Sequence, residues 1–316
     1  MITDPPPAPP VVAILGAGPA GMSCANACLS FGLKPVVLES ADHVGGTQRS
    51  NFHPNLWMLG YPDESGEAMT RRISEHFLNL PVDLRIGAEL RRCQATDGKF
   101  RLELHYGGED ASMIADAVVL STGMRPRSTP ELAALAGQTA RVIVGALNAA
   151  IRDRIRGNRV LILGGGDNAL DHALYLAERG NRVRVCARRA FSARKPFLDS
   201  CAARPEIELR ADCVPDGYAA EADAVAVRWG RITVRYDWLL VMYGYRPNTD
   251  VLARFDAAIR PALADSGHVR VDAWQRTSVA GIYAAGDLTE SPQPSVPTAI
   301  AQGLAAARAI ERDLLG

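Results

Sequence analysis

The sequence lacks an excess of charge of either sign. Its 316 residues include 35 Lys and Arg against 35 Asp and Glu, which gives a formal net charge of zero. A protein that binds nucleic acid or an anionic membrane along its surface normally needs a broad basic face. We therefore expect no nucleic-acid partner and no membrane partner.

Long apolar runs are also missing. No stretch approaches the roughly 18 consecutive apolar residues of a membrane-spanning helix, so the sequence predicts none. Residues 1–10 contain no basic segment followed by an apolar one, so we expect no secretory signal there. Half of these ten residues are proline, which favours a short disordered lead-in.

Cysteine is scarce and scattered, and no Cys-x-x-Cys motif occurs in the chain. The six cysteines are Cys24, Cys28, Cys93, Cys186, Cys201 and Cys213. Such a distribution is not a disulfide framework and favours a reducing, cytoplasmic location. Cys24 and Cys28 are spaced for one helix face, where disulfide geometry is rarely reached. Nothing in the sequence places Cys201 and Cys213 together, so we interpret all six as packing residues.

The first candidate site begins with a short apolar run at residues 11–15, which is typical of a buried parallel strand. Gly16-Ala17-Gly18-Pro19-Ala20-Gly21 follows, and its three glycines permit a tight turn, close approach of a pyrophosphate, and close helix packing. We expect a helix at 19–31, with its N-terminal N–H groups directed at that pyrophosphate. A second strand, 34–38, leads into Glu39, whose carboxylate can accept hydrogen bonds from a ribose. This order predicts a dinucleotide site.

The same pattern recurs later in the chain. Residues 159–163 form a second buried-strand run, followed by Gly164-Gly165-Gly166-Asp167-Asn168-Ala169 and a helix to about residue 179. Alanine replaces the third glycine, which the pattern tolerates because alanine also packs closely. Two dinucleotide sites in one chain imply electron transfer between two cofactors.

The strand that follows the second pattern, 182–186, does not end in an acid. It leads into Arg188 and Arg189, with Arg194 shortly after. A carboxylate there would repel a 2′-phosphate, whereas guanidinium groups can bind it bidentately, so the second site is predicted to prefer NADPH to NADH. The alternative is that these arginines form a solvated basic edge.

Five more segments, spread along the chain, complete an ordered set: Gly45-Gly46-Thr47-Gln48, Ser121-Thr122-Gly123, Arg188-Arg189, Gly244-Tyr245-Arg246-Pro247-Asn248-Thr249 and Gly281-Ile282-Tyr283-Ala284-Ala285-Gly286-Asp287. With both glycine patterns, this set resembles the small two-domain flavoproteins of the thioredoxin reductase type, a group that includes ferredoxin/flavodoxin–NADP reductases. The resemblance extends from about residue 11 to residue 315.

The resemblance implies FAD and NADPH as cofactors and assigns residues to each. For FAD it implies Gly16, Gly18, Pro19, Ala20, Gly21, Glu39, Gly46, Thr47, Gln48, Leu90, Thr122, Gly123, Asp287 and Val296. For NADPH it implies Gly164, Gly166, Asp167, Asn168, Ala169, Arg188, Arg189, Arg194 and Gly244.

The implied fold is α/β, with two Rossmann-like three-layer dinucleotide-binding domains. Residues 1–123 and 249–316 are expected to form the FAD-binding domain, and residues 124–248 an NAD(P)H-binding domain inserted into it. Relatives of this type imply a homodimer.

One departure from the resemblance bears on the substrate. Thioredoxin reductases carry a redox-active Cys-x-x-Cys shortly before the second glycine pattern, because paired thiols relay electrons from flavin to a protein disulfide. The corresponding segment here is Leu147-Asn148-Ala149-Ala150, which contains no sulfur. The resemblance therefore favours direct electron transfer to an external acceptor such as ferredoxin, flavodoxin or a small molecule.

Two other functions stay open at this point. One is a thiol–disulfide oxidoreductase that acts on a partner's cysteines or on small-molecule thiols, and the other is a flavin-binding sensor without turnover. His53, in a loop that lies near the flavin in the resembled group, is the one candidate for a catalytic residue, and a solvated loop histidine is the alternative. The histidine spacing predicts no metal site.

Overall fold

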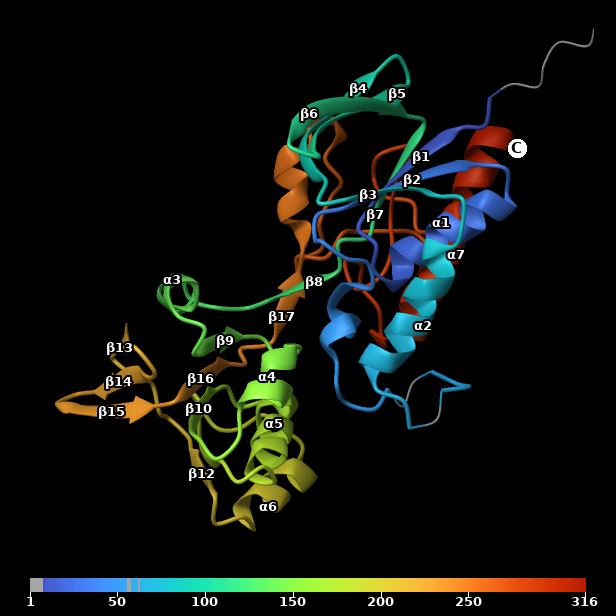
Figure 1. Ribbon diagram of the computed structural model, residues 1–316. Helices are drawn as coiled ribbons and strands as arrows, with labels where there is room; N and C mark the ends of the chain where they lie inside the picture. The colour runs from blue at the N-terminus through green and yellow to red at the C-terminus, as the bar shows by residue number, and fades with distance from the viewer. Residues whose placement is uncertain (1–7, 56–57, 62) are drawn as a thin grey trace, which may run out of the picture. The chain divides into compact units, whose positions relative to one another are not determined.

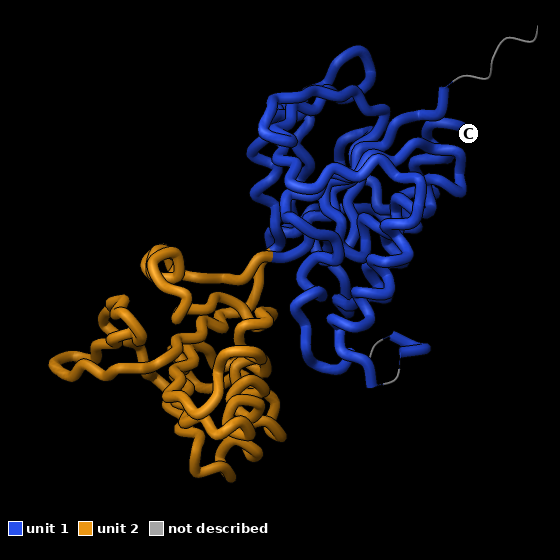
Figure 2. The backbone as a smooth tube through the Cα atoms, in the orientation of Figure 1, with its two compact units in different colours: residues 1–124, 247–316 blue, residues 125–246 orange. Residues whose placement is uncertain are grey.

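The computed structural model describes residues 8–55, 58–61 and 63–316, which fall into two compact units (Figure 2). One unit contains the described residues up to Met124 together with Pro247–Gly316, and the other is Arg125–Arg246. The chain enters the second unit once and leaves it once, so the second unit is an insertion in the first. Both crossings lie within two residues of the predicted boundaries.

The first unit is built on a five-stranded sheet in the order β18-β7-β1-β2-β3, with every neighbouring pair parallel (Figure 1). Its strands are β1 (Val11–Leu15), β2 (Lys34–Glu39), β3 (Asp83–Ile86), β7 (Ala117–Leu120) and β18 (Ile282–Ala284). Every residue of β7 and β18 is buried, as is all of β1 after its first residue. Continuous burial is expected because a parallel sheet is covered on both faces.

Alternate side chains of β1 divide the core of this unit between two faces. Val12 and Ile14 pack on one face with the helices, whereas Ala13 and Leu15 pack on the other. The helical layer contains α1 (Pro19–Ser30), α2 (Gly66–Leu78) and α7 (Val296–Leu315). The other layer is an antiparallel sheet of β4 (Glu89–Thr96), β5 (Lys99–Tyr106) and β6 (Glu109–Ala115), seen across the parallel sheet from α1 and α7 in Figure 1.

The second unit repeats the parallel plan with the order β12-β11-β10-β16-β9. Its strands are β9 (Val142–Val144), β10 (Arg159–Leu163), β11 (Arg182–Cys186), β12 (Ile207–Arg210) and β16 (Trp238–Val241). One face is covered by α3 (Pro130–Gln138) and an antiparallel sheet of β13 (Gly217–Ala220), β14 (Val225–Trp229) and β15 (Ile232–Tyr236). The remaining helices are α4 (Ala149–Arg154), α5 (Asp167–Ala177) and α6 (Lys195–Ala202). Both units are therefore three-layer α/β units, as predicted.

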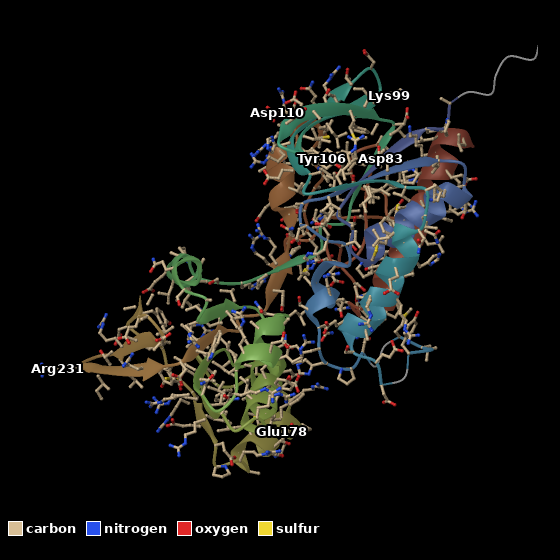
Figure 3. All side chains as sticks on the ribbon, in the orientation of Figure 1. Asp83, Lys99, Tyr106, Asp110, Glu178 and Arg231 are labelled. Atoms are coloured by element: carbon tan, nitrogen blue, oxygen red, sulfur yellow. The ribbon has the colours of Figure 1, made fainter. Side chains whose placement is uncertain are left out.

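The two crossings between the units pair with each other. They form a two-stranded sheet of β8 (Met124–Pro126) and β17 (Tyr245–Pro247), followed by the short 3-10 helices Thr249–Arg254 and Ala257–Ile259. Arg231 marks the tip of the β14–β15 hairpin (Figure 3). Among the described residues, no helix combines the length and apolarity needed to cross a membrane.

Helices α1 and α7 approach each other closely because a glycine lies at their contact. A Cβ added to Gly303 of α7 would lie 2.2 Å from the backbone oxygen of Ala20 and 3.0 Å from the backbone nitrogen of Cys24. Both atoms belong to the helix backbone and cannot rotate away. Any side chain at this position therefore has to push α7 away from α1.

We expect Gly303→Ala to lower the free energy of unfolding by about 1–3 kcal/mol, because the added methyl group overpacks the helix contact. Urea unfolding followed by circular dichroism measures the change. Gly137→Ala in α3 is the matched control, since nothing lies within 4 Å of its added Cβ. Equal stabilities of the Gly303 and Gly137 variants would contradict this account of the contact.

Candidate functional site

The turn between β1 and α1 has a conformation that only glycine supports. Gly16 has φ +108°, and a Cβ added there would lie 2.6 Å from the backbone oxygen of Ser121. A Cβ on Gly21 would lie 1.9 Å from the backbone oxygen of Gly16. Gly18 is different, because nothing lies within 4 Å of its added Cβ. The first and third glycines therefore shape the turn, and the second leaves room for a ligand.

The N-terminus of α1 has no capping side chain. Gly18 is the N-cap residue, and it has no side chain to bond the first N–H groups of the helix. Pro19 occupies the first helical position. Unpaired N–H groups and the helix dipole together favour a bound phosphate.

Glu39, at the end of β2, is held beside this turn. Its Oε2 accepts a hydrogen bond from the Ala17 N–H at 2.7 Å, and its Oε1 accepts one from the Ala41 N–H at 2.9 Å. A carboxylate has further acceptor capacity after two such bonds. The fixed carboxylate can therefore also accept hydrogen bonds from ribose hydroxyls, the role predicted for it.

The glycine segment 45–48 closes against the same turn. The Gly45 N–H donates to the Ala17 carbonyl at 2.8 Å, and a Cβ on Gly46 would lie 3.2 Å from the Gly18 Cα. Gly46 and Thr47 are exposed, and Gln48 Oε1 accepts from the Asn51 side chain at 2.9 Å.

Asp287 lies in the loop after β18, next to the start of α1. A Cβ on the preceding Gly286 would lie 2.9 Å from the Ala20 Cβ, and the Gly286 N–H donates to Gln302. Burial raises the pKa of the Asp287 carboxyl, and nearby His268 acts in the opposite direction. A largely buried acid of this kind is a candidate ligand-binding group.

The other residues predicted for FAD lie in separate segments of the first unit. Thr122 Oγ1 donates to the Asn248 carbonyl at 2.8 Å, and the Asn248 N–H donates to the Gly123 carbonyl at 2.8 Å. Leu90 lies in β4 and packs on the core beneath the antiparallel sheet. Val296 is the buried first residue of α7. The structure thus brings the segments of Glu39, Gly46 and Asp287 to the β1–α1 turn.

The second unit repeats the uncapped helix start. Gly164 has φ +152°, and its added Cβ would lie 2.4 Å from the Met242 backbone oxygen. A Cβ on Gly165 would lie 2.9 Å from that of Ala187. Gly166 caps α5 without a side-chain bond and has only the Ser192 hydroxyl, at 3.9 Å, near its added Cβ. The N–H groups at the start of α5 are therefore available to a phosphate.

A cavity of about 980 Å³ lies at this helix start. Its lining includes most residues predicted for NADPH: Gly164, Gly166, Asp167, Asn168, Ala169, Arg188, Arg189 and Gly244. Arg188 and Arg189 are exposed at its wall. The site suits a phosphorylated dinucleotide because it combines an N-terminal helix dipole with two guanidinium groups.

Arg194 is placed differently from the two other arginines. Its Nε lies 2.6 Å from Asp167 Oδ2, its N–H donates to Asp167 Oδ1 at 2.8 Å, and it is absent from the described lining. The backbone hydrogen bond from Arg194, and then its guanidinium, hold the pKa of Asp167 below its usual value. The pair thus neutralises an acid that would otherwise repel a phosphate at the start of α5.

Sequence analysis missed two tyrosines in the cavity lining. Tyr218 lies in β13 and Tyr243 follows β16. Their phenol groups interact through a side-chain hydrogen bond. Burial raises the pKa of both phenols. They belong to no local motif, and only the antiparallel sheet of this unit brings Tyr218 to the cavity.

All six cysteines are free, and two of them contact each other, a pairing that no spacing in the sequence indicates. Cys186 Sγ and Cys213 Sγ lie 2.7 Å apart in the second unit. Cys201 does not pair with Cys213: it lies in α6 and donates to the Leu170 carbonyl. Parallel pairing of β11 with β12 brings the Cys213 segment beside the end of β11.

The segment that aligns with the absent Cys-x-x-Cys starts α4. Asn148 caps this helix by accepting from the Ala150 N–H at 2.9 Å. The Leu147 N–H donates to the Tyr245 hydroxyl at 3.3 Å. Helix capping and packing thus account for the side chains at these positions.

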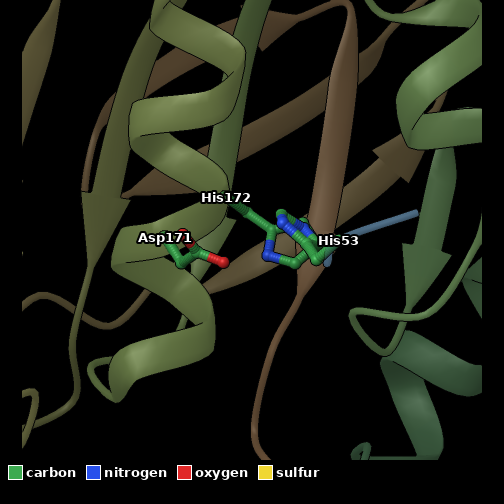
Figure 4. Close-up of side chains that lie close together, drawn as sticks. All are labelled: His53, Asp171 and His172. Carbon is green, nitrogen blue, oxygen red and sulfur yellow. The ribbon is translucent and has the colours of Figure 1, made fainter. Parts of the chain in front are cut away.

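The main chain of His53 and the ring of His172 both make hydrogen bonds. The His53 N–H donates to Asn51 Oδ1 at 3.1 Å, and the His53 carbonyl accepts from the Gly66 N–H. Trp57, which the sequence places in the same loop, lies outside the described residues. In α5, His172 follows Asp171 (Figure 4), and its ring nitrogens lie 2.8 Å and 3.0 Å from the carbonyl oxygens of Asn168 and Ala146.

Comparisons with known proteins agree with this arrangement. A thioredoxin reductase of Peptoclostridium acidaminophilum is 27% identical over an alignment of 320 residues. The alignment covers 95% of this chain and 96% of that protein. A ferredoxin–NADP reductase of Limosilactobacillus fermentum is 27% identical over 291 residues, which cover 87% of this chain and 84% of that protein. The solved thioredoxin reductase of Lactococcus lactis shares the fold, with a TM-score of 0.78 and 22% identity. The match covers 97% of this chain and 99% of that one.

The model of the pyridine nucleotide-disulphide oxidoreductase family matches residues 10–303. This match, together with the two relatives named above, supports the predicted enzyme class, an FAD-dependent NAD(P)H oxidoreductase, and its cofactors, FAD and NADPH. The chain belongs to the pyridine nucleotide-disulphide oxidoreductase family.

Proposed function

We propose that this chain is an NADPH-dependent FAD oxidoreductase that passes electrons to an external acceptor without an internal thiol relay, most like a ferredoxin/flavodoxin–NADP reductase. The observation that carries the proposal is a pair of uncapped helix starts behind glycine turns, in a chain with no Cys-x-x-Cys. Relatives named ferredoxin–NADP reductase support this acceptor class.

We assign FAD to the first unit. The N–H groups at the start of α1 bind its pyrophosphate, and Glu39 orients the adenosine ribose. Asp287 bonds the polar chain that links the flavin ring to the phosphates. Its half-buried carboxyl, whose pKa burial raises, remains accessible to such a ligand.

We assign NADPH to the cavity of the second unit. The start of α5 binds the pyrophosphate, and Arg188 and Arg189 bind the 2′-phosphate. When bound, FAD would supply the redox chemistry between NADPH and the external acceptor. The protein's part is to bind and orient both cofactors. The homodimer and the cytoplasmic location stay predictions.

Anaerobic stopped-flow mixing tests the function. We expect NADPH to bleach the oxidised flavin absorbance within seconds, and added oxidised ferredoxin or flavodoxin to restore it. A flavin that stays oxidised with excess NADPH would refute the proposal. Reduction by dithiols alone would favour the thiol–disulfide oxidoreductase, and reduction by neither would favour a flavin-binding sensor.

Replacing Arg188 and Arg189 by alanine tests the 2′-phosphate site. Each substitution should cost about 1.5–3 kcal/mol of NADPH binding, the usual value of a charged hydrogen bond, and leave NADH binding nearly unchanged. The KM values for both nucleotides, with a small artificial acceptor, measure the difference. Arg231→Ala at the hairpin tip is the control, and an equal loss for NADPH and NADH would remove the assigned role.

Replacing Asp287 by alanine tests the FAD site. The purified variant should retain less FAD per chain than the unmodified protein, because a buried acceptor for the cofactor is lost. The ratio of flavin to protein absorbance after gel filtration measures retention. Asp265→Ala, an exposed acid of the same unit, is the control. Full FAD content in the Asp287 variant would contradict the assignment.

A further inference from the structure

The second unit contains two cysteines whose sulfurs are almost within bonding distance. Cys186 Sγ and Cys213 Sγ are 2.7 Å apart, about 0.7 Å more than the roughly 2.05 Å of a disulfide bond. Cys186 is buried at the end of β11, and Cys213 is half-buried after β12. A movement of less than about 1 Å by the Cys213 segment would allow them to bond.

The backbone ties both cysteines to the nucleotide cavity. The Gly164 N–H, in the glycine turn, donates to the Cys186 carbonyl at 3.0 Å. The Cys213 N–H donates to the carbonyl of Ala187, the residue after Cys186, at 3.0 Å. The residues that follow the two cysteines line the cavity: Ala187, Arg188, Arg189, Val214 and Pro215.

We propose that Cys186 and Cys213 form a reversible dithiol–disulfide pair that couples thiol oxidation to nucleotide binding in this cavity. The formation of the disulfide stands on the geometry of the two sulfurs alone. The coupling rests in addition on the proposed binding of NADPH in the cavity.

The oxidant is a low-molecular-weight disulfide, and the exchange occurs in two steps. Cys213, the more exposed thiol, loses its proton and attacks one sulfur of the small disulfide, which forms a mixed disulfide and releases one small thiol. Cys186 then loses its proton and attacks the Cys213 sulfur, which releases the second small thiol. Two protein thiols are oxidised, one small disulfide is reduced, and the two protons pass to the released thiols.

The surroundings of Cys186 favour the disulfide once it has formed. Burial, followed by the contact with Cys213, raises the pKa of the Cys186 thiol, and Arg184 acts in the opposite direction. A dithiol becomes strongly oxidising when its reduced, thiolate form is stabilised. Here the thiolate of Cys186 is destabilised, so it does not stabilise the reduced form of the pair.

Disulfide formation shifts the cavity wall. Bonding draws the Cys213 segment toward the end of β11, and with it the residues that lie beside Arg188. A bidentate guanidinium contact depends on placement within a fraction of an ångström to about 1 Å. The oxidised protein is therefore expected to bind NADP⁺ several-fold more weakly than the reduced protein.

The first experiment counts thiols in the full-length, FAD-loaded protein. The protein is incubated in mixtures of oxidised and reduced glutathione, alkylated, digested and analysed by mass spectrometry. We expect a Cys186–Cys213 cross-linked peptide in oxidising mixtures and its loss with excess dithiothreitol. Cys213→Ser should abolish the cross-link, and Cys201→Ser, a cysteine of the same unit outside the pair, should keep it. The proposal is overturned if the protein is folded and both thiols remain free, and are therefore alkylated, after every mixture.

The second experiment measures the Kd of NADP⁺ by calorimetry for the reduced and the cross-linked protein. The coupling is supported if the cross-linked protein binds NADP⁺ more weakly and dithiothreitol restores the binding of the reduced protein. Oxidising conditions should not weaken binding in Cys213→Ser. Equal Kd values would overturn it. If even the reduced protein does not bind NADP⁺, the proposed function and the coupling both fail, while the thiol count still decides whether the disulfide forms.

Discussion

Both halves of this protein share one constraint: the backbone N–H groups at a helix start donate no hydrogen bond to a capping side chain. Gly18 and Gly166 occupy the two N-cap positions and supply no capping group. The strands β1 and β10 hold these helix starts at the carboxyl edges of their parallel sheets. The sheets, the helix packing and the glycine turns all serve to keep those N–H groups fixed and accessible.

The two sites differ in the charge that follows the next strand. In the first unit β2 ends in Glu39, whose carboxylate is held by two backbone N–H groups. In the second unit β11 leads into Arg188 and Arg189, which lie exposed on the cavity wall. Under the proposed assignment, the same scaffold would take a plain ribose in one unit and a phosphorylated one in the other, through the sign of charge at one topological position.

The fold and the glycine turns could be predicted because their signals are local. A buried strand, a glycine turn and a helix follow one another within about thirty residues, so the order of residues carries the information. Arg194 shows a limit of local signals: it follows the two cavity arginines closely in sequence, and the sequence does not reveal that its guanidinium pairs with Asp167. Tyr218 reaches the cavity only through an antiparallel sheet, a tertiary arrangement that no local spacing encodes.

The cysteines illustrate the same limit and also its consequence for function. A search for paired thiols in the sequence looks for short spacings, and those give only Cys24 and Cys28, on one helix. Parallel strands, in contrast, place residues far apart in sequence at one sheet edge, which is how Cys213 comes to lie beside Cys186. That same edge carries the arginines assigned to the 2′-phosphate. This shared backbone is the basis of the proposed coupling between sulfur chemistry and nucleotide binding, in a chain that has no thiol relay of the Cys-x-x-Cys kind.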